Sequence, residues 1–487
     1  MLVVKLNEMQ FEYDIHSLVK AFYPGKEVKV LEKSAEKQSE EGMPEFEIDF
    51  QSTSISFYII EDGERKYEKQ TVLKQPDSRP DVKNDLKQLI YDSLSEYLGK
   101  ELPWGTLTGI RPTKIPMTLL EEGKSEDEIL EYMKDVYKIS DEKGNLSLEI
   151  AKREKELLSR LHYKDGYSLY IGIPFCPTTC LYCSFTSYPI CVWKDKMDDY
   201  LTALEKEMEA TAQIMQGKIL DTVYIGGGTP TTLQAEELDR LITKLKATFD
   251  LSQVTEFTVE AGRADSITKE KLEVLYKHGI TRISVNPQTM NEETLKLIGR
   301  QATAAQTVET FKMAREMGFD NINMDIILGL PGETEEDVTY TIEKIKELHP
   351  DSLTVHSLAI KRASKLSQWI EQNGITALNN TDETMEIAAD GAKAMNMKPY
   401  YLYRQKNMSG NFENVGYAEE GKFGIYNILI MEELQTIVAL GAGSITKRVF
   451  QDGRIERCDN VKDVGLYIER IDEMIERKRR LFLNNIY

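Results

Sequence analysis

Residues 168–183 read Ser168-Leu-Tyr-Ile-Gly-Ile-Pro-Phe-Cys-Pro-Thr-Thr-Cys-Leu-Tyr-Cys183. The first seven residues form a short apolar run typical of a buried strand. Three cysteines follow at the spacing Cys-x3-Cys-x2-Cys, so one short loop carries three thiolates that can bind three corners of a cubic iron–sulfur cluster. Such clusters usually take four cysteines, and no fourth cysteine lies at a matching distance. One iron is therefore left open for a substrate or cofactor, which indicates chemistry rather than structure.

A structural zinc site is the alternative interpretation of these cysteines, since it takes four Cys or His ligands. Cys191 and His162 are the nearest side chains that could complete such a site. Chance clustering is a poor explanation, because three of only five cysteines in 487 residues share this loop. A disulfide framework is disfavoured by the odd number of cysteines and the absence of a secretory signal. Cys191 and Cys458 are interpreted as ordinary small residues.

Composition excludes several classes of partner. The formal net charge is -20, from 61 basic and 81 acidic residues, and a field of that sign repels nucleic acid and anionic lipid. No apolar run approaches the roughly 18 residues needed to span a bilayer, and Met1–Lys5 is too short and too soon charged for a signal peptide. We expect a cytoplasmic enzyme without a membrane span, in a reducing compartment that protects an oxygen-sensitive cluster.

From residue 168 the chain alternates between short β-rich runs and segments with helical periodicity. The predicted strands cover 168–174, 222–226, 255–261, 280–285, 321–328 and 352–358. The predicted helices cover about 194–216, 235–249, 266–278, 303–317 and 334–348. Six such units predict a parallel sheet with crossover helices, two short of the eight in a closed barrel. The predicted fold is therefore α/β, a partial (β/α)6 barrel over residues 166–360.

The segments on either side predict two further domains. Residues 1–165 combine alternating strands with a helical pattern near 81–98, which indicates an N-terminal α+β domain with a helical connector. Arg111 and Lys114 lie in a loop of this domain and either bind an anion or serve only its structure. Residues 361–487 predict a C-terminal α+β extension on the substrate side.

Residues suited to bind a cofactor follow successive predicted strands, at the ends that meet along one edge of a parallel sheet. If the open iron binds S-adenosylmethionine (SAM), three consecutive glycines in Gly226–Pro230 let backbone amides approach it closely, although a tight turn would also explain them. Gln288 and Asp325 are placed to fix ribose hydroxyls, and Arg300 offers a bidentate fork to a carboxylate. Each alone fits a packing role, but their convergence favours a binding site.

Two motifs carry a resemblance to a known family. Tyr170–Cys183 together with Gly226-Gly-Gly-Thr-Pro-Thr231 resembles the radical SAM enzymes of the oxygen-independent coproporphyrinogen III oxidase family. The resemblance covers about 168–360 and extends faintly to Leu440–Ile445. The segments Gly109–Lys114 and Gly410–Tyr417 are similar to the HemZ branch of that family.

The resemblance implies two cofactors. A 4Fe–4S cluster would be bound by Cys176, Cys180 and Cys183. SAM would contact Tyr170, Tyr182, Gly227, Gly228, Thr229, Glu260, Gln288, Arg300, Asp325, Ala359 and Ile445.

The reaction implied by the resemblance is oxidative decarboxylation of two propionates of coproporphyrinogen III to vinyls, giving protoporphyrinogen IX in haem biosynthesis, with an electron donor such as flavodoxin or ferredoxin. Gly172 stands where the best-characterised oxidases have His, and Phe185 stands where they have a further cysteine. Phe185 is similar to the haem-chaperone branch. A haem-binding chaperone and a radical enzyme acting on haem itself therefore remain alternative hypotheses.

A basic and aromatic group in the C-terminal region is a second candidate surface. It would bind the propionates and rings of a tetrapyrrole, or else form an ordinary amphipathic segment. Its members are Arg362, Lys398, Tyr400, Tyr401, Tyr403, Arg404 and Lys406.

Overall fold

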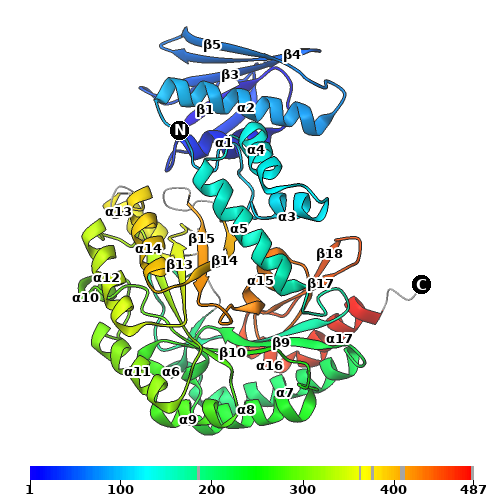
Figure 1. Cartoon of the computed structure of the whole chain (residues 1–487), viewed down its shortest axis with the longest axis vertical. Helices are drawn as coiled ribbons and strands as arrows, with labels where there is room; N and C mark the ends of the chain where they lie inside the picture. The colour runs from blue at the N-terminus through cyan, green and yellow to red at the C-terminus, as the bar shows by residue number, and fades with distance from the viewer. Residues whose placement is uncertain (184–186, 361–363, 375–377, 406–411, 484–487) are drawn as a thin grey trace. The chain divides into compact units, whose positions relative to one another are not determined.

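The computed structural model describes residues 1–183, 187–360, 364–374, 378–405 and 412–483 (Figure 1). Phe185, Arg362 and Lys406, which the sequence singles out, lie outside these residues.

The chain divides into two compact units. The first comprises Met1–Lys152 with Arg404–Asn411, and the second comprises Arg153–Tyr403 with Phe412–Tyr487. The division into three domains at residues 165 and 360 stays a prediction.

The first unit is built on a five-stranded sheet in the order β2-β1-β3-β4-β5. Its strands are β1 (Leu2–Leu6), β2 (Val28–Glu32), β3 (Glu45–Phe50), β4 (Ser54–Glu61) and β5 (Glu64–Val72). Its helices are α1 (Glu12–Phe22), α2 (Arg79–Leu98), α3 (Lys114–Glu121) and α4 (Glu126–Tyr137), and α5 (Asp141–Leu158) runs on into the second unit. Alternate residues of β3, namely Phe46, Ile48 and Phe50, are buried in one apolar core with α1 and α2. Every second residue of β3 is therefore buried, as the alternating sequence of a strand with one face on the core predicts.

The second unit contains an eleven-stranded sheet in the order β14-β15-β13-β12-β11-β10-β9-β6-β16-β17-β18. Six consecutive parallel strands are those predicted from the sequence: β6 (Tyr167–Ile173), β9 (Leu220–Gly227), β10 (Glu256–Gly262), β11 (Arg282–Val285), β12 (Ile322–Leu328) and β13 (Ser352–Ser357). The helices that connect them form an outer arc in Figure 1: α7 (Met197–Ile214), α8 (Ala235–Thr248), α9 (Lys269–Lys277), α11 (Ala304–Met317) and α12 (Glu335–Leu348). The predicted α/β fold is confirmed.

The barrel is open, because its first and last strands pair with strands from the C-terminal region instead of with each other. Beyond β13 lie the antiparallel β15 (Asn414–Ala418) and β14 (Lys398–Tyr403). Beside β6 lies the parallel β16 (Thr436–Leu440), followed by the antiparallel β17 (Ile445–Val449) and β18 (Ile455–Asp459). The C-terminal residues thus extend the barrel sheet at both edges.

Short elements complete the second unit. They are β7 (Phe175–Cys176), β8 (Tyr188–Pro189), α6 (Ile190–Trp193), α10 (Glu292–Leu297), α13 (Lys365–Asn373), α14 (Asp382–Ala394), α15 (Ile425–Glu432), α16 (Val464–Glu469) and α17 (Ile471–Leu483). Arg470 caps α16 and separates it from α17. None of the described helices combines the length and apolar character needed to cross a lipid bilayer.

Helix α15 is held at the amino-terminal ends of the central strands. Glu256, the first residue of β10, accepts hydrogen bonds from the backbone N–H of Ile425 at 2.5 Å and of Tyr426 at 3.4 Å. A carboxylate is favourable there because the first turn of a helix exposes unsatisfied N–H groups and positive charge. The Tyr426 ring stacks on Tyr224 of β9 with centroids 4.4 Å apart. Helix α15 therefore closes the end of the barrel opposite to the strand carboxyl ends.

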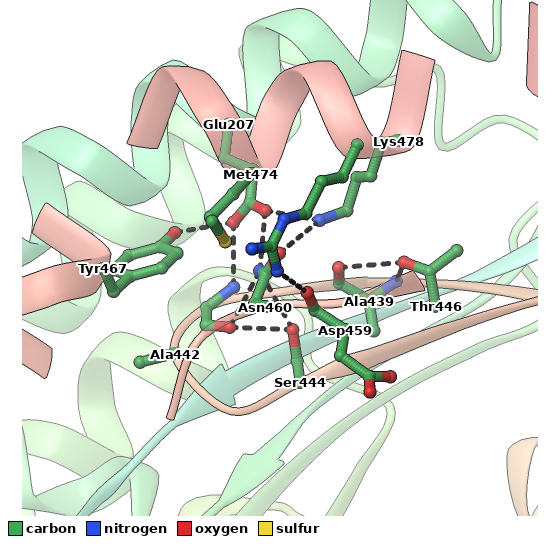
Figure 2. A network of polar contacts seen from close by, with 12 residues as sticks. Glu207, Ala439, Ala442, Ser444, Thr446, Asp459, Asn460, Tyr467, Met474 and Lys478 are labelled. Atoms are coloured by element: carbon green, nitrogen blue, oxygen red, sulfur yellow. Dashed lines mark hydrogen bonds and ion pairs between the residues drawn. The ribbon is translucent and has the colours of Figure 1, made fainter. Parts of the chain in front are cut away.

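A buried ion pair fixes the turn between β16 and β17 (Figure 2). Glu207 of α7 and Lys478 of α17 lie 2.5 Å apart, with side chains 0% and 1% exposed. Glu207 also accepts from the Tyr467 hydroxyl at 2.6 Å and from the Gly441 N–H at 2.9 Å. Asn460 donates to Glu207 at 2.8 Å and accepts from Lys478 at 3.0 Å. Glu207 thus accepts four hydrogen bonds and Lys478 donates two, which is what makes the burial of these charges tolerable.

The turn between β16 and β17 contacts the carboxyl end of β6, the first strand of the barrel. A Cβ on Gly441, where φ is +95°, would lie 2.3 Å from the Gly172 carbonyl oxygen, so only glycine fits. The Tyr200 hydroxyl donates to the same carbonyl at 2.7 Å. The network therefore positions backbone at the mouth of the barrel.

We predict that Lys478→Met lowers the free energy of unfolding by about 3–5 kcal/mol, because Glu207 is left buried and uncompensated. Chemical denaturation of the purified protein measures this. Lys206→Met is the matched control, since Lys206 and Asp472 join the same two helices at 2.8 Å but are 51% and 80% exposed. It should cost less than about 1 kcal/mol. Equal losses in the two variants would contradict the prediction.

Candidate active site

The cysteine loop leaves the carboxyl end of β6 and lies between two other strand ends. Beside it runs the glycine loop, where Gly228 N–H donates to Ile173 O at 2.8 Å and Thr229 N–H donates to Phe175 O at 2.7 Å. On the other side Leu181 N–H donates to Ile298 O at 2.9 Å. The cysteine loop is thus in contact with the loop after the second strand and with the segment after α10, which follows the fourth strand.

The three cysteines differ in exposure. Cys176 and Cys180 are buried, and Cys183 is half-buried. Burial raises the pKa of the Cys176 thiol, while the Thr229 hydroxyl, 3.5 Å from its sulfur, and the Arg263 charge lower it. A thiol whose thiolate is poorly solvated ionises most readily when a metal binds.

The alternative zinc site loses a candidate ligand. His162 precedes β6, at the end of the strand away from the cysteines, and its Nδ1 lies 3.0 Å from Asp221. Cys191 is exposed on α6. Among the residues described, no three Cys, His, Asp or Glu side chains are arranged to hold a single metal ion. Ligands of a cluster bind separate irons, so they stand further apart than those of one ion.

The glycines are required by the packing of the chain itself. A Cβ on Gly228 would lie 2.5 Å from Phe175 O and 3.0 Å from Cys176 Sγ. A Cβ on Gly226 would lie 2.8 Å from Glu260 Oε2, and Gly227 has φ of +115°. Without side chains, the loop lies against both the cysteine loop and Glu260.

Polar atoms without partners mark the end of β11. Asn286 Oδ1, Gln288 Oε1 and Arg300 Nε are buried and have no hydrogen-bond partner among the described residues. Arg300 instead uses Nη1 to donate to Asn286 O at 2.5 Å and Nη2 to donate to Tyr182 at 3.3 Å. Gln288 has φ of +66°, a strained conformation for a side chain of its size. Unsatisfied buried groups and backbone strain are typical of a ligand site.

The third and fifth strands contribute two carboxyl groups. Tyr224 donates to Glu260 at 2.5 Å, and burial together with the charge of Asp325 raises the pKa of Glu260 to about 7. Tyr170 stacks on Tyr224 with ring centroids 6.1 Å apart. The side chain of Asp325 accepts from Asn323 at 2.7 Å and lies 4.0 Å from His356 Nε2. The predicted residues of four strands therefore face the interior of one open barrel.

Two predicted residues lie at the rim. Ala359 follows β13 and is half-buried. Ile445 begins β17 with 45% of its surface exposed, and its backbone pairs with Asp459. Their contacts with SAM stay a prediction, as do those of the other candidate residues.

The members of the basic and aromatic group that the structure describes differ in burial and in their partners. Tyr400 and Tyr401 are buried in the core, and Lys398 is exposed and paired with Glu420 at 3.1 Å. Arg404 belongs to the first unit, where it is 5% exposed, donates to Leu107 O at 2.6 Å and lies over the Trp104 ring. In β14 the consecutive residues Tyr400, Tyr401 and Leu402 are all buried, whereas Lys398 at its start is exposed, so this segment contributes to core and surface as the ordinary amphipathic alternative expects. The hydroxyl of Tyr403 lies 3.4 Å from His356 Nδ1 in the barrel.

Several interior residues were missed from the sequence. Arg263, directly after β10, is 3% exposed and contacts the cysteine loop. Tyr224 and Tyr426 form part of the interior wall, and Glu333 is buried beside Thr289. Arg263 lies just after a predicted strand, and this position in the sequence could have identified it as a candidate site residue.

Comparison with known proteins bears on this geometry. The family model of the radical SAM superfamily matches residues 170–345. The oxygen-independent coproporphyrinogen-III oxidase-like protein HemZ of Bacillus subtilis is 42% identical over 411 residues, which cover 83% of this chain and 82% of that protein. This chain belongs to the same radical SAM family.

Other members of the family match over shorter stretches. The heme chaperone HemW of Bacillus subtilis is 39% identical over 40% of this chain and 51% of its own length. The oxygen-independent coproporphyrinogen III oxidase of Escherichia coli is 33% identical over 39% of this chain and 42% of its own length. A solved structure of coproporphyrinogen III oxidase (HemN) from Escherichia coli superposes with a TM-score of 0.51 at 23% identity, covering 66% of this chain and 73% of that one, and supports the fold. Membership of the radical SAM family implies a 4Fe–4S cluster and SAM.

We predict that Glu333 makes the stability of the protein depend on pH. Thr289, next to Gln288, donates to Glu333 at 2.5 Å, and burial raises the pKa of this carboxyl to about 7. The protonated form is favoured by folding, so its contribution is present below about pH 4.5 and is lost as the pH rises through about 7. The shift from 4.5 corresponds to about 3 kcal/mol.

Urea unfolding of the cluster-free protein at pH 5 and pH 8 measures this effect. Glu333→Gln should reduce the difference in stability between the two pH values. The exposed Glu335→Gln, in the first turn of α12, should leave the difference unchanged. The same difference in wild type and Glu333→Gln would contradict the assignment.

Proposed function

We propose that this protein is a radical SAM enzyme that oxidatively decarboxylates two propionate side chains of coproporphyrinogen III to vinyl groups, giving protoporphyrinogen IX in haem biosynthesis. The observation that carries this proposal is the cysteine loop bordered by the glycine loop and by the unsatisfied atoms of Asn286, Gln288 and Arg300. The 42% identity with the HemZ oxidase-like protein supports the choice of reaction.

In this proposal Cys176, Cys180 and Cys183 bind the cluster. Their loop is short, two of its three cysteines are buried, and its backbone is hydrogen-bonded to chain segments on both sides. Three thiolates leave one iron without a protein ligand, which suits a cofactor that binds the metal directly.

The remaining site residues would hold SAM. Gln288 Oε1 is free to accept from a hydroxyl or amine, and Arg300 Nε is free to donate to a carboxylate, each among the residues described. The proposed set is Tyr170, Tyr182, Gly227, Gly228, Thr229, Glu260, Gln288, Arg300, Asp325, Ala359 and Ile445. When both groups are bound, reductive cleavage of SAM supplies a radical able to abstract hydrogen from an unactivated carbon.

The chain itself would exclude water and orient the reactants. Tyr170, Tyr224 and Tyr426 form a stacked wall, with ring centroids 4.4–6.3 Å apart, above the end closed by α15. His356 lies between Asp325 and the hydroxyl of Tyr403. This arrangement can limit the access of water to a reactive site and places an imidazole beside it.

The partners follow from this function. They are a tetrapyrrole carrying propionates and a one-electron donor of the flavodoxin or ferredoxin type, in the cytoplasm. Because the net charge is -20, a polycarboxylate substrate needs a local basic lining.

A haem-binding chaperone is the second candidate. The 39% identity with HemW supports it, although the match spans about half of that protein. Phe185, which stands where the best-characterised oxidases have a further cysteine, also agrees with it.

Anaerobic reconstitution tests the proposal. We expect about four iron and four sulfide per chain, and, with SAM, reductant and coproporphyrinogen III, both protoporphyrinogen IX and 5′-deoxyadenosine. Cys180→Ala should lose most of the bound iron, because two thiolates do not hold such a cluster. Cys191→Ala is the matched control, since this exposed cysteine lies outside the motif.

Parallel incubations with haem separate the alternatives. Absence of both products with coproporphyrinogen III would overturn the oxidase proposal. Stoichiometric haem binding with transfer to an acceptor would favour the chaperone, and a modified tetrapyrrole would favour an enzyme acting on haem itself.

A further inference from the structure

A buried arginine at the end of β10 contacts the cysteine loop. Arg263 Nη1 lies 2.8 Å from Thr178 Oγ1, 3.0 Å from Thr178 O and 3.8 Å from Cys180 Sγ, and donates to all three. The residue is 3% exposed. Its charge is therefore poorly screened by water where it faces the cysteine sulfur.

Asp265 fixes the orientation of this guanidinium on the side away from the cysteine loop. Nε and Nη2 donate to the two carboxylate oxygens of Asp265 at 3.0 and 2.6 Å. A bidentate pair of this kind locks the plane of the guanidinium. The third nitrogen, Nη1, is thereby left to point at Thr178 and Cys180.

A contact of this kind acts on a redox centre through charge. A cluster bound by thiolates becomes more negative by one charge when it is reduced. Hydrogen bonds to its sulfurs, and the charges around it, are the main influences on its reduction potential. A cation that donates to a ligating sulfur stabilises the reduced form more than the oxidised form and so raises the potential.

We propose that Arg263 is a positioning residue that raises the reduction potential of the cluster by donating to the Cys180 thiolate, with Asp265 holding it in place. This inference rests on the proposed binding of a 4Fe–4S cluster by the three cysteines. A higher potential would make the cluster reducible by donors of ordinary strength.

The test compares substitutions at Arg263 that keep or remove its charge. Arg263→Lys and Arg263→Gln are reconstituted anaerobically, and their cluster potentials are measured by redox titration followed by electron paramagnetic resonance. We expect Arg263→Gln to keep its iron and sulfide and to shift to a more negative potential. Arg263→Lys should shift less, because it keeps the charge but loses the fixed fork.

One further variant guards against loss of folding. Arg282→Gln is the matched control: Arg282 is also 3% exposed but begins β11, at the end of the barrel away from the cysteines. It should leave the potential unchanged even if it lowers the melting temperature.

The outcomes distinguish this inference from the proposed function. If the wild-type protein takes up no cluster, the proposed function fails and this inference falls with it. If the wild type takes up a cluster and Arg263→Gln has the same potential at full iron content, only the inference is overturned. If Arg263→Lys and Arg263→Gln lose the cluster equally, Arg263 is an anchor of the loop and the electrostatic role is wrong.

Discussion

Parallel pairing is the constraint on which the rest of the second unit depends. Seven neighbouring strands, from β13 through to β16, run in the same direction, so their carboxyl ends meet along one edge of the sheet. The cysteine loop, the glycine loop, Glu260, Gln288 and Asp325 all follow from that geometry, because each lies within one of these strands or just after it. The direction of the strands therefore sets the position of the site, and no single residue does so alone.

Buried charged groups create a second demand, because each must be hydrogen-bonded or paired. Glu256 accepts hydrogen bonds from the first N–H groups of α15, and Glu207 on the outer helix α7 pairs with Lys478. These groups are saturated, whereas Gln288, Asn286 and Arg300 keep unsatisfied atoms. The contrast between the two sets separates residues that support the barrel from residues that suit a ligand.

Two arginines close to the cysteine loop carry charge opposite in sign to the net charge of the chain. The protein carries a net charge of -20, yet Arg263 and Arg300 are buried or half-buried close to the cysteine loop. Thiolates and a carboxylate-bearing cofactor would concentrate negative charge there, and fixed guanidinium groups are suited to offset it. The acidic surface and the basic site are therefore compatible, since screening by water and salt confines each to its own surroundings.

The sequence by itself determined the alternation of strands and helices, the position of the cysteine loop and the family. These are local features: the apolar periods of β6 to β13 are visible within each segment, and Cys176, Cys180 and Cys183 are close in the chain. Only the tertiary structure decided that β14 to β18 extend the barrel sheet at its two edges, that Arg404 belongs to the first unit, and that Arg263 faces Cys180. Such facts depend on contacts between residues tens to hundreds of positions apart, and no period or spacing in the chain encodes which distant partner a buried charge will meet.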